Sequence, residues 1–327
     1  MPSLFVRSCS GIRQRDALLA KGSLLACVFV AIILTACSNE RGQNAGTLKL
    51  GYISSEITIS DRDGAFEALR NYLQERLSSP VELIQTAAYG PAIEAMKSGE
   101  IDILHFGTYS YLIAESEGSA DAFAVKGRLD RSPRNYESLI LTPSNRPWKS
   151  IDEALKNKEN LEVQFTNQAS TSGYLIPFAF YRSKGIDPDT SFGKVRFSNS
   201  HVLSILYTSE GVCDLASVSA GYLEDLIKRE KIEPDSVRIL WRSEPIPSGP
   251  VAYRSSLDAE TKASIRKAFF EAHKSDPIIW NRIKAQSSDQ DFMYIPFDSS
   301  KLDWLRTLAP TKGQVNNSPH SSIPAKI

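Results

Sequence analysis

One stretch of the chain combines three hydroxyl side chains with a glycine and leads into an expected helix. It reads Ser170-Thr-Ser-Gly173 and follows a predicted strand at Leu161–Phe165. The first N–H groups of a helix have no intrahelical carbonyl partner, and the helix dipole adds partial positive charge there. With the hydroxyls, these groups suit a small oxyanion. Simple capping of the helix by serine or threonine explains this segment alone equally well.

Two further segments place side chains that could contact a ligand after predicted strands. Tyr89 lies in a loop before an expected helix over Pro91–Ser98, and Ser200-His201 begins another helix. Loops at the carboxyl ends of parallel strands are where open α/β sheets bind ligands. A lone histidine is more often structural than functional, so His201 needs a partner before it belongs to a site.

The elements that must position these residues follow a regular alternation of short apolar runs and helical patterns. This alternation predicts α/β layers with largely parallel sheets. Strands are expected at Thr47–Ile53, Val81–Gln85, Ile101–Phe106, Phe123–Val125, Ser138–Thr142, Leu161–Phe165, Val195–Phe197, Asp214–Ser217, Ser236–Trp241 and Pro250–Tyr253. Helices are expected at Asp63–Leu77, Pro91–Ser98, Tyr109–Ser116, Ser172–Ser183, Val202–Ser209, Tyr222–Lys231 and Asp258–Ala272, with another that opens at Ser150.

Length and charge limit the classes of protein that the chain could belong to. Its 327 residues suggest about two domains, and 42% hydrophobic residues are typical of a packed protein. The 38 basic and 38 acidic residues balance, which excludes a nucleic-acid binder that relies on broad phosphate neutralisation. The four histidines are scattered and show no zinc spacing with cysteine, so neither a metal nor another cofactor is expected.

The N-terminus is typical of a secretory signal over residues 1–36. Basic residues precede a short apolar run, Leu24–Leu34, which is about half the length needed to span a bilayer. Leu34-Thr-Ala-Cys37 resembles the lipobox of bacterial lipoproteins, which implies acylation of Cys37; an uncleaved anchor helix is the weaker alternative. Residues 37–46 are expected to form a tether and residues 309–327 a flexible tail. Cys213 is the single cysteine after Cys37, which excludes an intramolecular disulfide in the mature chain.

In their order along the chain, these segments resemble the phosphate/phosphite/phosphonate-binding proteins that deliver ligand to bacterial ABC importers. The resemblance runs from about residue 48 to about residue 300 and implies an α/β, two-lobed periplasmic-binding-protein fold of type II. In this Venus-flytrap arrangement the ligand lies in the cleft between the lobes. The matching pieces are Gly51-Tyr-Ile-Ser-Ser-Glu56, Tyr89-Gly-Pro91, Gly99-Glu-Ile-Asp102, Ser170-Thr-Ser-Gly-Tyr-Leu-Ile-Pro177, His201 and Ile246-Pro-Ser-Gly-Pro250.

The resemblance also implies which residues bind the ligand. Members of the family hold the phosphorus oxyanion with the Ser-Thr-Ser hydroxyls and amides, the loop tyrosine and the histidine. Phe106 stands where an aromatic residue, often tyrosine, follows a strand in the family, and it has no hydroxyl. The expected ligand-binding residues are Tyr89, Ser170, Thr171, Ser172, His201, Phe106 and Ser54.

Two glycines depart from the phosphonate-binding pattern. Members that bind an aminophosphonate carry acidic residues for its amine at the positions that correspond to Gly221 and Gly249 here. The ligand of this chain is therefore expected to be smaller or to lack an amine, unless Glu224 or Asp225 supplies the missing carboxylate.

The implied function is that of a monomeric substrate-binding lipoprotein in the periplasm, with the permease and ATPase of an importer as partners. Lobe 1 is expected to span 47–142 plus 251–308 and lobe 2 143–250, with crossings near Leu141–Ser144 and Ser248–Tyr253. Ser38 after Cys37 favours the outer membrane. One alternative is a lipid-anchored sensor module for a membrane kinase. A serine hydrolase that uses Ser170 or Ser172 with His201 and Asp214 is less favoured, because the chain has no Gly-x-Ser-x-Gly elbow.

Overall fold

The computed structural model describes residues 46–54, 62–285 and 291–309. The expected signal segment, Cys37 and the tail from Pro310 lie outside the described residues. The described residues from Thr47 to Ala309 belong to one compact unit. None of its described helices is both long enough and apolar enough to cross a membrane.

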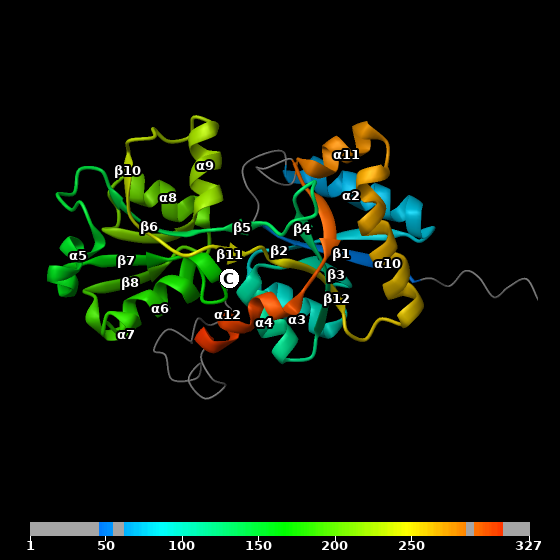
Figure 1. Ribbon diagram of the computed structural model, residues 1–327, viewed down its shortest axis with the longest axis horizontal. Helices are drawn as coiled ribbons and strands as arrows, with labels where there is room; N and C mark the ends of the chain where they lie inside the picture. The colour runs from blue at the N-terminus through cyan, green and yellow to red at the C-terminus, as the bar shows by residue number, and fades with distance from the viewer. Residues whose placement is uncertain (1–45, 55–61, 286–290, 310–327) are drawn as a thin grey trace, which may run out of the picture. The chain divides into compact units, whose positions relative to one another are not determined.

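The first of two large sheets belongs to lobe 1 and has the strand order β13-β4-β12-β3-β1-β2 (Figure 1). Its strands are β1 (Leu48–Ile53), β2 (Val81–Thr86), β3 (Ile103–His105), β4 (Ala120–Gly127), β12 (Pro250–Arg254) and β13 (Met293–Pro296). Strand β1 runs parallel to both of its neighbours, β2 and β3. Strands β12, β4 and β13 extend the sheet by antiparallel pairing.

The second sheet belongs to lobe 2 and has the order β10-β6-β9-β7-β8. Its strands are β6 (Ser138–Pro143), β7 (Glu162–Phe165), β8 (Lys194–Phe197), β9 (Leu215–Ser219) and β10 (Val237–Arg242). Strand β7 is parallel to β8 and β9, whereas β6 is antiparallel to β9 and β10. The prediction of largely parallel sheets is therefore wrong. Strands β4, β6 and β12 flank the passages between the lobes and are antiparallel to their neighbours. A βαβ unit would instead make neighbouring strands parallel.

The first passage of the chain between the sheets lies before the expected place, whereas the second overlaps the expected Ser248–Tyr253. Leu141, expected near the first crossing, pairs with Ile239 and Ala216 inside the second sheet. The first passage instead spans residues 128–137 and the second 243–249. Each passage contributes a two-residue strand, β5 (Asn135–Tyr136) and β11 (Ile246–Pro247), and these two pair antiparallel between the lobes (Figure 1).

Helices cover the faces of both sheets. The prediction for α2 is confirmed, because Phe66, Leu69 and Leu73 are buried on one face. The serine expected to open a helix, Ser150, accepts a hydrogen bond from the N–H of Glu153. The α-helices are α2 (Arg62–Leu77), α3 (Tyr89–Ser98), α4 (Thr108–Ser116), α5 (Ile151–Ala154), α6 (Ile176–Ser183), α7 (Pro188–Ser191), α8 (His201–Ser209), α9 (Ala220–Lys228), α10 (Ala259–Glu271), α11 (Pro277–Lys284) and α12 (Asp303–Leu308).

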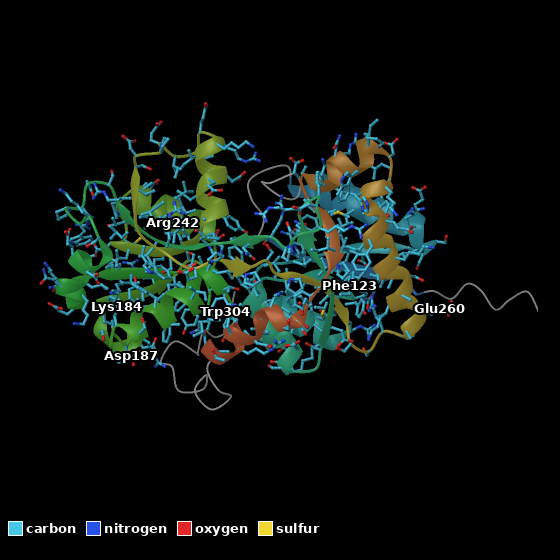
Figure 2. The ribbon with its side chains drawn as sticks, in the orientation of Figure 1. Phe123, Lys184, Asp187, Arg242, Glu260 and Trp304 are labelled. Carbon is cyan, nitrogen blue, oxygen red and sulfur yellow. The ribbon has the colours of Figure 1, made fainter. Side chains whose placement is uncertain are left out.

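Apolar side chains form cores within the lobes and a contact between them. In lobe 1, where Figure 2 labels Phe123, the ring of this residue stacks on Tyr253 and contacts Phe269 of α10 edge-on. Leu175 at the start of α6, in lobe 2, belongs to the same buried cluster as Leu112 of α4, in lobe 1. Burial of this shared cluster favours a state in which the lobes are in contact, since removing apolar surface from water stabilises the contact.

Candidate anion-binding site

The serine-threonine-serine stretch forms a wide turn at the start of α6. Its residues Thr171–Leu175 form a π-helical turn, in which the N–H of Leu175 donates to the carbonyl of Ser170 at 3.0 Å. Ser170 caps this turn, with its Oγ accepting from the N–H of Gly173 at 3.1 Å. A side chain at position 173 is excluded, because a Cβ there would lie 1.7 Å from Oγ1 of Thr166. Close packing of the turn on the end of β7 therefore requires the glycine.

Thr171 joins the two lobes. Its Oγ1 accepts a hydrogen bond from the N–H of Tyr109 in α4 at 2.8 Å, and the residue is 3% exposed. The hydroxyl hydrogen of Thr171 is still available to donate, since a hydroxyl can accept and donate at once. The hydroxyl of Thr171 can therefore accept the hydrogen bond that connects the lobes and donate to a ligand oxygen at the same time.

His201 is held as a neutral hydrogen-bond donor at the start of α8. Its Nδ1 accepts from the N–H of Ser219 at 3.1 Å, so the ring proton lies on Nε2, which is 3.4 Å from Oγ of Ser170. Burial lowers the pKa of His201 to about 3. The ring also stacks on Tyr222, with 4.6 Å between the centroids. His201 therefore has the partner that a functional histidine needs.

A cavity of about 210 Å³ brings most of the predicted residues together, and we refer to it as the interlobe cavity. Ser54 is the exception: its hydroxyl donates to the carbonyl of Thr86 at 3.1 Å, and it does not line the cavity. The described residues that line the cavity are Tyr89, His105, Phe106, Gly107, Lys126, Arg134, Tyr136, Ser170, Thr171, Ser172, His201, Ser219, Tyr222, Ser248 and Gly249.

Tyr89 reaches the cavity from a helix rather than from the expected loop. It is the first residue of α3, follows the extended residue Ala88, and is 2% exposed. Pro91 does not prevent this start, because a proline in the first turn of a helix has no intrahelical hydrogen bond to lose. The tyrosine is thus fixed by regular backbone.

Sequence reasoning missed the charged residues of the cavity. Lys126 lies near the end of β4, Arg134 lies in the first passage between the lobes, and His105 ends β3. A signal for Lys126 was present, since an ionisable residue directly follows the apolar run Phe123–Val125. Arg134 has no such signal, because its place depends on how the passage folds.

None of the described residues that line the cavity is an aspartate or a glutamate. The structure gives a reason at Gly249, where a Cβ would lie 2.0 Å from the carbonyl oxygen of Phe106. Gly221 does not line the cavity. Neither proposed substitute lines it: Glu224 is exposed, and Asp225 is paired with Arg229 at 2.8 Å. The described surroundings therefore attract anions.

The residues named for a serine hydrolase do not form a triad. Asp214 accepts from the N–H of Glu162 and lies 2.6 Å from Nη2 of Arg146, away from His201. The nitrogen that a triad acid would orient, Nδ1 of His201, instead accepts the N–H of Ser219. Within residues 46–54, 62–285 and 291–309, no cluster of His, Cys, Asp and Glu could hold a metal ion.

Two α/β lobes that share one anion-suited cavity define a ligand-binding protein of the two-lobed periplasmic class. The sequence model of one family, described as the periplasmic substrate-binding protein of phosphonate ABC transporters, matches residues 60–291. The chain therefore belongs to this family of phosphonate ABC transporter substrate-binding proteins.

Named relatives agree with this assignment, and a solved structure shares the fold. The chain is 24% identical over 260 residues to the phosphate-import protein PhnD of Mycolicibacterium smegmatis, covering 73% of this chain and 78% of that protein. It is 23% identical over 246 residues to the phosphonates-binding periplasmic protein of Escherichia coli, covering 75% and 71%. The crystal structure of PhnD1 from Prochlorococcus marinus with methylphosphonate has a TM-score of 0.67 and 19% identity, with 80% and 96% covered.

Proposed function

We propose that the protein binds a small phosphorus oxyanion in the interlobe cavity and delivers it to an ABC importer. The observation that carries this proposal is that six of the seven residues expected from the sequence line one cavity between the lobes. Hydroxyls, a neutral histidine donor and two cations surround that cavity, and no described carboxylate does. Phosphate and phosphonate groups are bound in this way, by converging donors and positive charge.

Closure of the lobes on the ligand is part of the proposal. Lobe 1 comprises residues 47–127 and 250–308, and lobe 2 comprises residues 138–242, with β5 and β11 as the connection. Ser170, Thr171, Ser172 and His201 belong to lobe 2, whereas Tyr89 belongs to lobe 1. A ligand that touches both sets favours the closed state, because binding shifts the equilibrium toward the state that offers more contacts.

The ligand is tested by thermal shift and calorimetry with phosphate, phosphite, methylphosphonate, 2-aminoethylphosphonate and sulfate. A ligand present at a hundred times its dissociation constant should stabilise the protein by about 2.7 kcal/mol. We expect stabilisation by at least one phosphorus oxyanion and none by sulfate. Absence of any shift with all four phosphorus compounds would contradict the proposal.

The same protein should act as a binding protein and not as an enzyme. Its family consists of substrate-binding transport proteins, and the candidate triad lacks its acid. We therefore expect no turnover of chromogenic phosphate or carboxylate esters. Neighbouring genes for a permease and an ATPase support import, whereas a neighbouring kinase gene and no permease gene would favour the sensor alternative.

The periplasmic location follows from the family, and the lipid anchor is a proposal that rests on the sequence alone. We propose acylation of Cys37, which lies outside the described residues. Mass spectrometry of the mature N-terminus should find a lipid-modified Cys37. An unmodified start at another residue, or a retained Met1, contradicts the anchor.

A further inference from the structure

One side of the interlobe cavity carries positive charge that the binding of a single oxyanion by the serine turn does not use. We call Lys126, Arg134 and His105 the cationic side, and Ser170, Thr171, Ser172 and His201 the serine side. The cationic side lies on β3, β4 and the passage that follows β4, and the serine side lies in lobe 2. In Figure 1, β4 and α6 accordingly lie in different lobes.

Lys126 is the best-defined cation of this side. Its Nζ lies 4.8 Å from the ring centroid of Phe292, and its strand position pairs with Tyr294 of β13. Among the described residues no carboxylate lies within ion-pair distance of this ammonium group. A partly buried ammonium that faces an aromatic ring and the like charge of Arg134 is stabilised when an anion enters the cavity, because pairing offsets the cost of desolvation.

Lys126 and His105 belong to the same part of lobe 1, because their strands β4 and β3 both pair with β12. Burial and the charge of Lys126 together lower the pKa of His105, and the charge of Arg134 adds to the effect of burial on Lys126. Burial alone lowers the pKa of His201 on the serine side. These directions agree with the placement of Lys126, Arg134 and His105 on lobe 1 and on the passage that follows β4.

His105 and Arg134 are fixed in place by backbone groups. Nε2 of His105 lies 3.2 Å from the carbonyl of Gly249 and donates to it in the neutral ring. Arg134 donates from Nη2 to the carbonyl of Asp291 at 2.5 Å. These contacts hold the cationic side in one arrangement before a ligand enters, which lowers the ordering cost of binding.

We propose that the ligand carries a second anionic group, which the cationic side binds while the serine side holds the phosphorus oxyanion. This inference rests on the proposed function and names the substrate class: a phosphonate that bears a carboxylate on a short linker. The length of the linker is limited, because the cavity of about 210 Å³ is below the ~300–1,000 Å³ of sites for drug-sized ligands. The carboxylate pairs with Lys126.

The test compares three ligands by calorimetry on the mature protein purified in detergent. Phosphonoacetate has the second anion, methylphosphonate has none, and 2-aminoethylphosphonate has a cation in its place. We expect phosphonoacetate to bind at least tenfold more tightly than methylphosphonate. In Lys126→Met this ratio should fall to threefold or less, while Lys97→Met, which removes an equal charge from an exposed ion pair with Glu117, should keep the wild-type ratio.

The outcomes separate this inference from the proposed function. If methylphosphonate binds and phosphonoacetate binds equally or more weakly, the second anionic group is wrong and the proposed function stands. If neither these ligands nor phosphate or phosphite binds, the proposed function fails as well. The ratio in the unsubstituted protein decides the matter even if Lys126→Met does not fold.

Discussion

The serine side and the cationic side of the interlobe cavity are built in different ways. The serine side comes mostly from one turn of the chain, in which Ser170, Thr171 and Ser172 follow each other and Gly173 permits close packing. The cationic side gathers Lys126, Arg134 and His105 from three segments that only the folded chain brings together. The positions of the serine-side residues therefore depend on local backbone, whereas those of the cationic-side residues depend on the topology of lobe 1 and of the passage that follows β4.

The substitution with the largest expected effect acts on the serine side. Thr171→Val removes a hydroxyl that accepts from Tyr109 and faces the cavity. Loss of a hydrogen bond to a charged acceptor costs roughly 1.5–3 kcal/mol, so affinity for the phosphorus oxyanion should fall roughly 10- to 100-fold. Calorimetry measures this loss.

Thr208→Val is the matched control, because Thr208 is also buried in lobe 2 but its hydroxyl bonds only to Ser204 of the same helix and to Cys213. Unchanged affinity in Thr171→Val would reduce the serine side to a helix cap.

The second prediction contrasts ligand charge at the cationic side. 2-Aminoethylphosphonate should bind at least tenfold more weakly than methylphosphonate. Its ammonium is repelled by Lys126, and no described residue that lines the cavity offers a carboxylate to pair with it. Tenfold corresponds to about 1.4 kcal/mol, which is less than the cost of a buried unpaired charge. Competition calorimetry with both ligands settles the order. Tighter binding of the aminophosphonate would show that a carboxylate reaches the cavity.

The third prediction concerns pH and also tests the cationic side. Burial and the nearby Arg134 lower the pKa of Lys126 from 10.5 to about 7 in the ligand-free protein. His105 and Arg134 face the same group and do not change charge near neutral pH, since the pKa of His105 is about 3. As the pH rises from 7 to 9, Lys126 loses its proton, so the preference for phosphonoacetate over methylphosphonate should decrease several-fold.

The two phosphonates titrate at different pH values, because the carboxylate of phosphonoacetate raises the pKa of its phosphonate. Lys126→Arg provides the control, because arginine stays charged throughout this range, so any change of the ratio with pH in this variant comes from the ligands. The decrease in the unsubstituted protein should exceed the change in Lys126→Arg. A ratio in the unsubstituted protein that does not change between pH 7 and 9 would mean that Lys126 does not bind the second anion.

The smallest expected effect is on stability. The pKa of Lys126 is lower in the folded chain than in the unfolded chain, so the unfolded chain binds more protons between pH 7 and 10.5. Lys126 therefore destabilises the ligand-free fold most below pH 7, and this cost disappears as the pH approaches 10.5. Lys126→Met should raise the Tm at pH 7 by about 2–4 °C and by less at pH 10. Scanning calorimetry without ligand measures the difference, and a lower Tm at pH 7 would show that packing by the lysine stem dominates.

The success of sequence reasoning follows the same division between local and topological features. Strands and helices with clear periodicity, such as β2 and α2, were predicted because local apolar spacing determines them. The antiparallel direction of strands such as β6 and the place of the first passage were not predicted, because they depend on the pairing of β6 with β9 and β10, which are distant in the chain. In the site, the serine turn was found from adjacent residues. Lys126 and Arg134 were missed: the apolar run before Lys126 marks the end of a strand, but only the folded chain shows that both residues face a common cavity.

The close approach at Gly249 also constrains how this protein could change during evolution. An added Cβ would lie 2.0 Å from the carbonyl oxygen of Phe106 and 3.0 Å from Gly107, both backbone atoms. An aspartate or glutamate at position 249 would therefore require the backbone after β3 to move. An acidic residue is accommodated more easily at Gly221, where an added Cβ would have no atom within 4 Å. In the proposed site, the exclusion of a carboxylate at position 249 is thus a property of the backbone.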